Sequence, residues 1–253
     1  MILRRLGNKK RIAQDIIKHF PPHRIYIEPF FGAGGIFFYK QRAKYNFLND
    51  LDDDVYNLWN VFFNRREELI EAIELMPYHE SLFQHWRHNK EEEPIRKAIR
   101  FLMLSNFGYM GKPETMAFIN DNPIQHIIKT TKKILIDGGC EFMNCDFRKV
   151  LGKIHLTRPY LNIPRSFIYC DPPYLNTGNN YSNSFTEQDT TDLFTMCIDS
   201  KAKFAISEFD NPFILDLAKL HDLNVIKIGE RQAMKTRKTE ILITNYRTQN
   251  TLF

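Results

Sequence analysis

The chain has 253 residues, of which 43% are hydrophobic and 26% charged, a balance close to the average for soluble globular proteins. Collagen-like, disordered and membrane-spanning proteins are excluded, because no apolar run approaches the roughly 20 residues of a transmembrane helix. The N-terminus carries charges without an apolar stretch behind them, so we expect no signal peptide, no membrane partner and a cytoplasmic location. The cysteines show no paired spacing and are expected to be free thiols: Cys140, Cys145, Cys170 and Cys197.

The net charge of +5 is unevenly distributed along the chain. Residues 1–24 hold seven basic residues and one acidic residue, and residues 227–240 hold five basic and two acidic residues. Two basic segments on an otherwise mildly acidic chain are typical of a surface that meets phosphate groups. Two solvated ends would give the same pattern, so charge alone leaves both interpretations open.

Short apolar runs rich in β-branched and aromatic residues alternate with helical stretches, which predicts a mostly parallel α/β sheet. The expected strands cover residues 24–28, 45–49, 167–170, 204–207, 223–228 and 240–245. In such sheets the ligand binds beyond the carboxyl ends of the strands. The polar motifs described next follow predicted strands, so they are candidates for the functional site.

The middle of the chain breaks this alternation, because it shows amphipathic helical patterns and no convincing buried strand. Helices are expected over residues 55–76, 81–89 and 94–105. A mainly helical block inside an α/β pattern is typical of an inserted subdomain. We therefore predict an insert over residues 55–133, between residues 1–54 and 134–253 of one α/β domain.

The first predicted strand runs into a glycine-rich turn, IEPFFGAGG, over residues 27–35. Such a turn lets the backbone approach a ligand closely and directs the N-terminus of a following helix at it, although a plain tight turn is the alternative. Asp50 ends the next strand, at about the distance where an acidic residue holds the hydroxyls of a nucleoside ribose. Residues 52–54, all Asp, are expected to cap and begin the next helix.

The sequence Asp171-Pro172-Pro173-Tyr174 follows the apolar strand FIYC directly. Two prolines stiffen the turn and remove two backbone donors, which leaves carbonyl groups available to a ligand. The Asp171 carboxylate and a neighbouring carbonyl can both accept hydrogen bonds from one exocyclic amino group. The ring of Tyr174 can stack on an extruded base.

The order of glycine turn, acidic residue, helical insert and DPPY resembles the DNA adenine-N6 methyltransferases of the Dam-like (D12) class, over nearly the whole chain. Further elements are similar to those of the family: Gly7-Asn8-Lys9, the acidic segment 46–58, the segment 142–147 (FMNCDF) and the segment 237–246 (RKTEILITNY). The resemblance implies a Rossmann-like methyltransferase sheet with a C-terminal antiparallel hairpin. It also implies transfer of a methyl group from S-adenosylmethionine to the adenine N6 of a specific double-stranded DNA sequence.

The resemblance also implies roles for individual residues. The expected catalytic residues are Asp171, Pro172 and Tyr174. The expected cofactor-binding residues are Arg5, Lys9, Glu28, Phe30, Gly32, Gly34, Asp50, Asp146, Phe147 and Asp171. The expected DNA-binding residues are Tyr109, Lys112, Arg237 and Lys238. We expect no metal site, a monomer, and a restriction endonuclease of the same specificity as a candidate partner.

The chain departs from the family pattern at two places. Arg5 stands where the family often has Trp, so a stacking role is not expected there. The segment NFGYMG (106–111) resembles a family hairpin, but residues 112–114 do not reproduce the basic residue of GATC-reading members, so the target sequence stays open. Two other functions compete: a methyltransferase acting on RNA or a small amine, and an inactive DNA-binding relative. The helical insert with basic ends argues against the former, and the intact glycine turn and DPPY argue against the latter.

Overall fold

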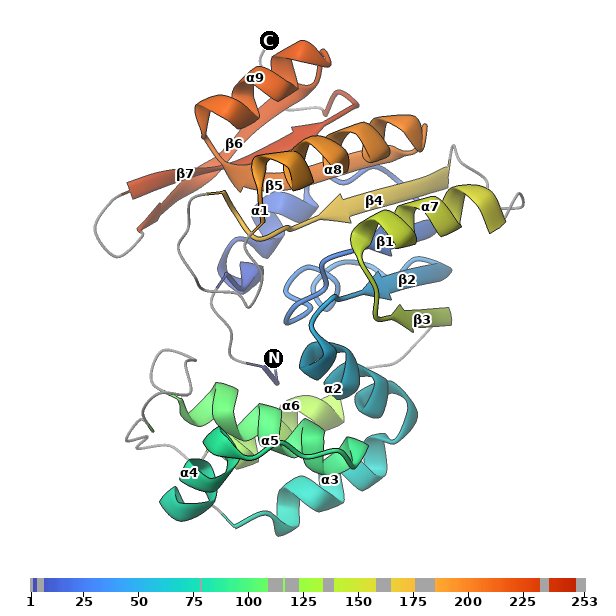
Figure 1. Cartoon of the computed structure of the whole chain (residues 1–253). Helices are drawn as coiled ribbons and strands as arrows, with labels where there is room; N and C mark the ends of the chain where they lie inside the picture. Colours follow the sequence, from blue (N-terminus) through green and yellow to red (C-terminus); the bar gives the residue numbers. More distant parts are fainter. Residues whose placement is uncertain are drawn as a thin grey trace.

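A computed structural model describes residues 2–3, 7–77, 79–108, 116, 123–133, 139–157, 165–175, 185–232 and 237–248. Within these ranges the strands form one seven-stranded sheet in the order β3-β2-β1-β4-β5-β7-β6 (Figure 1). The strands are β1 (Ile25–Glu28), β2 (Tyr45–Asn49), β3 (Gly139–Met143), β4 (Ser166–Cys170), β5 (Lys203–Phe209), β6 (Asn224–Gln232) and β7 (Arg237–Thr244). The neighbouring strands β3, β2, β1, β4 and β5 pair in parallel. Strand β7 is antiparallel to its neighbours β5 and β6. The expected sheet with its C-terminal antiparallel hairpin is confirmed.

The central strands are apolar along their whole length because helices or loops cover both faces. Every residue of β1 and of β4 is buried, which explains the continuous apolar runs that predicted them. Strand β3 was not predicted. It is the edge strand beside β2, its residues are half-buried or exposed, and its sequence GCEFM contains a glycine and a glutamate. An edge strand of this kind lacks the apolar pattern by which strands are recognised.

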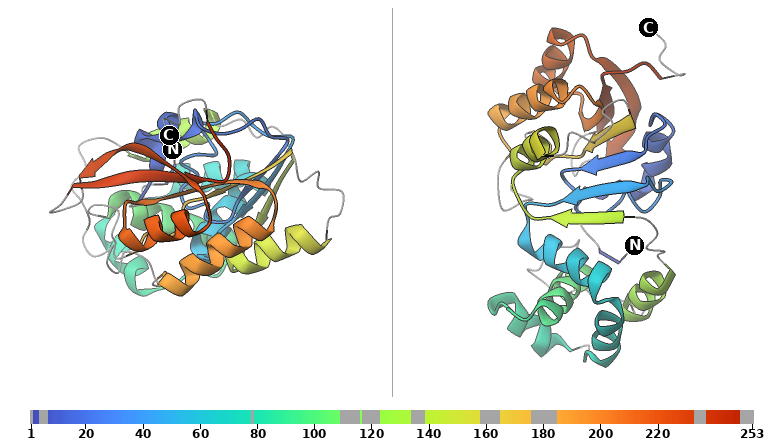
Figure 2. Two further views of the ribbon diagram at one scale, coloured as in Figure 1. Left: turned by 90° about the horizontal axis from the view of Figure 1, so that it is seen from above. Right: turned by 90° about the vertical axis from the view of Figure 1, so that its right-hand side faces the viewer.

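Helices cover the two faces of the sheet unequally. Helices α7 (Phe147–Thr157), α8 (Glu187–Asp199) and α9 (Pro212–Leu220) lie together on one face (Figure 2). The opposite face carries the 3₁₀ helix η1 (Lys9–Arg11) and the short helix α1 (Ala13–Ile17) (Figure 2). Because successive strand residues point to opposite faces, Ile27 and Ile168 join one apolar cluster while Tyr26 and Phe167 join the other.

A block of five helices lies beyond the β3 edge of the sheet (Figure 1). It consists of α2 (Asp53–Asn64), α3 (Arg66–Leu75), α4 (Glu80–His88), α5 (Pro94–Phe107) and α6 (Pro123–Lys133). The described part of residues 55–133 contains no strand, only an isolated bridge between Gly108 and Met116. One apolar cluster runs from the sheet into this block and includes Phe31 and Trp59. The helical block is therefore packed onto the sheet through a shared core.

The start of α2 was predicted correctly, but its end was not. The Asp52 side chain accepts hydrogen bonds from the amides of Asp54 and Val55, as expected for an N-cap. The single helix expected over residues 55–76 is two helices that meet at Arg65, whose backbone is not helical (φ −134°, ψ 40°). The Arg65 guanidinium pairs with Glu68 and Glu93, so it stabilises this break. No helix in the described ranges has the length and apolar character needed to cross a bilayer.

Candidate active site

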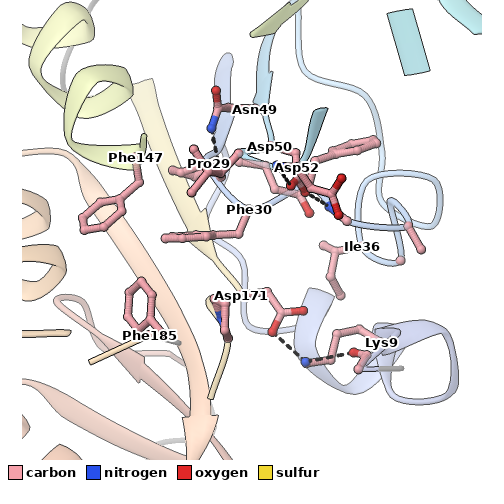
Figure 3. A pocket seen from close by; sticks show the side chains of 18 of the residues that line it. Lys9, Pro29, Phe30, Ile36, Asn49, Asp50, Asp52, Phe147, Asp171 and Phe185 are labelled. Carbon is pink, nitrogen blue, oxygen red and sulfur yellow. Dashed lines mark hydrogen bonds and ion pairs between the residues drawn. The ribbon is translucent and has the colours of Figure 1, made fainter. Parts of the chain in front are cut away.

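A cavity of about 320 Å³ lies at the carboxyl ends of β1, β2 and β4 (Figure 3). The sequence predicted a ligand site at this edge of the sheet. Eight of the expected cofactor-binding residues line it: Lys9, Glu28, Phe30, Gly32, Asp50, Asp146, Phe147 and Asp171. They come from five separate segments of the chain, so the fold brings distant motifs into one site.

The glycine turn after β1 forms one wall of the cavity. Gly32 and Gly34 adopt left-handed backbone conformations, with φ of 52° and 68°, which side-chain-bearing residues rarely adopt. The Phe31 amide donates to the Asn49 carbonyl at 2.8 Å, which fixes the turn against the end of β2. The expected helix after this turn is absent: residues 30–40 form successive turns. The positive φ of Gly34 interrupts a helix at its start.

Gly34 and Gly35 have different roles in this turn. Gly34 does not line the cavity, because its α-carbon faces the Phe38 ring, 2.4 Å from where a Cβ would lie. Gly35 faces the N-terminal segment, where a Cβ would lie 3.0 Å from the Lys9 amide nitrogen. Gly35 therefore permits the close approach that places Lys9 in the cavity.

Asp50 shapes the turn that it faces. Its Oδ2 accepts from the Gly32 amide at 2.7 Å and its Oδ1 accepts from the Asp52 amide at 2.9 Å. The preceding Asn49 bridges strand ends, because its Nδ2 donates to the carbonyls of Pro29 (2.9 Å) and Cys145 (2.8 Å). The spacing along the sequence predicted Asp50 as a site residue. It did not predict the hydrogen bonds by which Asp50 and Asn49 hold the backbone of these turns.

Three aromatic rings form the opposite wall (Figure 3). The centroid of Phe30 lies 5.4 Å from Phe147 and 5.8 Å from Phe185. Phe185 was not expected from sequence. It precedes Thr186, which begins α8 with a capping box, so the start of α8 fixes the position of this ring.

An ion-pair cluster joins α7 to α8 beside the aromatic wall. The Arg148 guanidinium lies 2.6 Å from both Asp189 and Asp192. Asp146 accepts from the Arg148 amide at 2.8 Å, so its carboxylate caps the start of α7. Asp189 also lines the cavity and was missed, because an aspartate in the first turn of a helix is common in sequences.

Lys9 and Asp171 meet at the end of the cavity that lies below the aromatic wall in Figure 3. The Lys9 ammonium lies 2.6 Å from Asp171 Oδ1 and donates to the Gly7 carbonyl at 3.2 Å. Lys9 is 3% exposed, so this pair is shielded from solvent on the lysine side. A charge-assisted hydrogen bond in such surroundings fixes the orientation of the carboxylate.

The turn 171–174 contributes two residues to the cavity lining, Asp171 and Pro173. Pro172 is buried and Tyr174 is half-buried, and neither lines the cavity. The Tyr174 hydroxyl donates to Glu240 of β7. The Tyr174 ring meets Phe209 edge to face, with centroids 4.7 Å apart. The Tyr174 ring, expected to stack on the base, is thus fixed by Glu240 at its hydroxyl and by Phe209 at its ring.

Buried acids lie close to this turn. Burial raises the pKa of Glu28 well above its usual range, and its Oε2 accepts from the Tyr26 hydroxyl at 2.9 Å. Burial also raises the pKa of Glu208 to about 8, and Glu208 accepts from the Phe209 amide at 2.8 Å. Burial thus favours the neutral form of both groups near Asp171.

Several expected site residues lie outside the described part of the chain. They are Arg5, Tyr109 and Lys112, and also the side chain of Arg237, whose backbone lies in β7. Lys238 is described: its ammonium lies 5.1 Å from the centroid of the Phe209 ring. In the described ranges, no group of three His, Cys, Asp or Glu side chains is arranged to hold a metal ion.

Comparison with known proteins identifies the family. The chain matches the D12 class N6 adenine-specific DNA methyltransferases over residues 6–234. The chain belongs to this family. The DNA adenine methylase of Escherichia coli K12 is 31% identical over 256 aligned residues, covering 88% of this chain and 85% of that protein. The DNA adenine methylase of Serratia marcescens is 24% identical, covering 95% of this chain and 96% of that protein.

Solved structures are more distant. A human methyltransferase 10 domain containing protein is 10% identical with a TM-score of 0.44, covering 95% of this chain and 83% of that chain. A likeness at this level adds nothing to the family assignment, which rests on the sequence matches. Membership makes this chain an adenine-specific DNA methyltransferase, whose reaction requires a methyl donor of the S-adenosylmethionine type.

Proposed function

We propose that the cavity binds S-adenosylmethionine and that the turn 171–174 holds the N6 amino group of an adenine extruded from double-stranded DNA. The observation that carries this proposal is the position of Asp171, which lines the cavity and also begins the DPPY turn. A residue that orients the acceptor nitrogen toward the methyl group must border both the donor and the acceptor. Asp171 satisfies this requirement.

The chemistry of the cavity lining fits this cofactor. S-Adenosylmethionine carries a sulfonium and an ammonium, together with a ribose and an adenine ring. Five aspartates are among the described residues that line the cavity, against a single lysine: Asp50, Asp52, Asp146, Asp171 and Asp189 against Lys9. Such a lining favours a cationic ligand. The open space beside Gly32, where a Cβ would have no neighbour within 4 Å, lets a ligand approach the backbone.

The residues divide among the parts of the cofactor. Asp50 holds the ribose hydroxyls, because a carboxylate accepts several hydrogen bonds, two of them here from backbone amides. The rings of Phe30 and Phe147, with Asp146 at the start of α7, hold the adenine. The glycine turn and Lys9 border the methionine part. Bound in this way, the cofactor supplies an electrophilic methyl group.

The turn prepares the amino group that accepts the methyl. The adenine N6 lone pair is delocalised into the ring, so the nitrogen is a poor nucleophile. The Asp171 carboxylate and the Pro172 carbonyl accept its two hydrogens and favour a more tetrahedral nitrogen. One of these hydrogens leaves as a proton to the Asp171 carboxylate, which the Lys9 ammonium contacts at 2.6 Å. Tyr174 stacks on the extruded base and replaces the lost stacking of the duplex.

The basic ends and the helical block supply the DNA contacts. Residues 1–24 and 227–240 carry the excess positive charge, and Lys238 lies on the C-terminal hairpin. The helical block, residues 55–133, chooses the target sequence through residues that include Tyr109 and Lys112. We propose that the enzyme acts as a monomer. A restriction endonuclease that cuts the same sequence is its candidate partner, and its specificity need not be GATC.

Mapping of methylated bases tests the proposal. The purified enzyme is incubated with S-adenosylmethionine and unmodified plasmid DNA, and modified bases are mapped by single-molecule sequencing. We expect N6-methyladenine in one sequence context, and none with Asp171→Ala. The control is Asp216→Ala, which removes an exposed carboxylate on α9. Unmodified DNA with the wild type, methylation of RNA only, or near wild-type activity of folded Asp171→Ala would overturn the proposal.

A further inference from the structure

Glu240 is a fully buried acidic residue on β7, the strand that runs antiparallel to the others. It pairs in register with Phe209 at the end of β5, and this places its side chain behind the turn 171–174. A buried carboxylate is costly unless its charge and hydrogen bonds are compensated. The compensation here comes from residues of the proposed catalytic machinery.

Two contacts join Glu240 to opposite ends of the turn. The Tyr174 hydroxyl donates to Glu240 Oε1. The Lys9 ammonium lies 3.7 Å from the same oxygen and 2.6 Å from Asp171 Oδ1. Lys9 also lies 4.5 Å from the centroid of the Tyr174 ring. Asp171, Lys9, Glu240 and Tyr174 thus form a closed set of contacts around the turn.

The same face of the C-terminal hairpin supports the Tyr174 ring. Residues 238 and 240 are two positions apart on β7, so their side chains lie on the same face of the strand. The Lys238 ammonium lies over the Phe209 ring at 5.1 Å, and Phe209 contacts the Tyr174 ring edge to face. The hairpin therefore contacts the tyrosine at its hydroxyl through Glu240 and at its ring through Phe209.

Stability alone does not explain this buried charge. Replacing a buried ion pair with apolar residues of similar volume is often neutral or stabilising, so such a pair is weak evidence for a stabilising role. Removing one partner is costly because the other stays buried without compensation. What the arrangement does supply is fixed geometry for Lys9 and Tyr174, which touch Asp171 and the proposed base site.

We propose that Glu240 is a positioning residue of the methyl transfer: it holds the Lys9 ammonium on Asp171 and the Tyr174 ring beside the target base. This inference rests on the proposed roles of Asp171 and Tyr174. Glu240 does not line the cavity, so it acts on the reaction through these neighbours. Its loss changes the rate of the chemical step more than the affinity for either ligand.

The test compares two conservative changes from carboxylate to amide. Glu240→Gln keeps the shape and an oxygen acceptor for Tyr174 but removes the charge beside Lys9. Asp216→Asn is the control, because it makes the same change from carboxylate to amide at an exposed position of α9. Single-turnover rates are measured with saturating enzyme and cofactor. Affinities for S-adenosylmethionine and DNA are measured by calorimetry and fluorescence anisotropy.

We expect Glu240→Gln to lower the single-turnover rate about tenfold or more, with both affinities within about twofold of wild type. Asp216→Asn keeps the wild-type rate. The double variant Tyr174→Phe/Glu240→Gln loses less rate than the product of the two single fold-losses, because both changes affect the same contact. A purely structural role of Glu240 would give additive effects. Tyr174→Phe keeps the test valid if Glu240→Gln does not fold, since it breaks the same contact from the other side.

A wild-type rate for folded Glu240→Gln, or strictly additive effects, would overturn the inference. If Glu240→Gln does not fold, a wild-type rate for Tyr174→Phe would overturn it. These outcomes are distinct from failure of the proposed function, which shows as no adenine methylation by the wild type or as an active Asp171→Ala variant.

Discussion

The Lys9 ammonium lies 2.6 Å from Asp171 Oδ1, although 162 positions of the chain separate the two residues. Lys9 belongs to the basic N-terminal segment, and Asp171 is the first residue after β4. Among the described residues that line the cavity, Lys9 is the only Lys or Arg. The contact thus brings the beginning of the chain into the cavity and gives Asp171 its counter-charge.

Lys9→Met should therefore impair the chemical step. Losing a charged hydrogen bond costs about 1.5–3 kcal/mol, which corresponds to a roughly 10- to 150-fold lower single-turnover rate. The measurement is the methylation rate under single-turnover conditions with saturating cofactor. Lys10→Met is the control, because Lys10 is the exposed neighbour in the same 3₁₀ helix. Equal rates for the two variants would show that the Lys9 contact is dispensable.

Asp50→Ala should weaken binding of S-adenosylmethionine by about 1.5–3 kcal/mol, typical of charged hydrogen bonds. Part of this loss arises because the Gly32 amide no longer has its acceptor and the glycine turn loosens. Isothermal titration calorimetry measures the affinity. Asp53→Ala, which removes an exposed carboxylate at the start of α2, should bind like the wild type. An unchanged affinity of Asp50→Ala would mean that Asp50 holds the backbone of the glycine turn and does not contact the cofactor.

Glu208 should make the protein less stable as the pH rises. Burial raises its pKa from 4.5 to about 8, so the folded state retains a proton that the unfolded chain releases above about pH 4.5. The contribution of Glu208 to stability is thus complete below pH 4.5, decreases up to about pH 8, and is constant above that. Glu208→Gln should flatten this slope in urea unfolding curves. Glu71→Gln, at an exposed position of α3, should keep it, and equal slopes for wild type and Glu208→Gln would contradict the prediction.

Lys238→Ala should weaken DNA binding and reduce its dependence on salt. If Lys238 neutralises one phosphate, the slope of log K against log salt should decrease by about 0.9. Fluorescence anisotropy at several salt concentrations gives this slope. Lys219→Ala, at an exposed lysine of α9, should leave the slope unchanged. A slope that does not move in Lys238→Ala would place this lysine away from the DNA backbone.

The strands were predictable where burial on two faces leaves an apolar run, as in β1 and β4. Strand β3 was missed because an edge position tolerates Gly139 and Glu141. The helix expected after the glycine turn does not form, since Gly34 has a positive φ. These differences share one cause: local sequence shows neither the position of a strand in the sheet nor the backbone angle of a glycine.

The site was predictable where a motif follows a strand, as for Asp50 and Asp171. Phe185 and Glu240 do not belong to such a motif, because their roles depend on contacts between distant parts of the chain. Glu240 lies within a segment whose resemblance to the family was recognised, yet its contact with Tyr174 joins residues 66 positions apart. The stacking role of the Tyr174 ring is an expectation from chemistry, whereas the partner of its hydroxyl required the structure.

The Trp59 side chain limits how this enzyme can be recombined with its relatives. Its indole nitrogen donates to the Gly32 carbonyl at 2.8 Å, and its ring meets Phe31 edge to face. Trp59 lies in α2, the first helix of the helical block, but its hydrogen bond supports the turn that borders the cavity. A chimaera that exchanges the whole of residues 55–133 would also replace this support. Exchange of sequence specificity between family members therefore requires a junction after α2, so that each glycine turn keeps its own tryptophan.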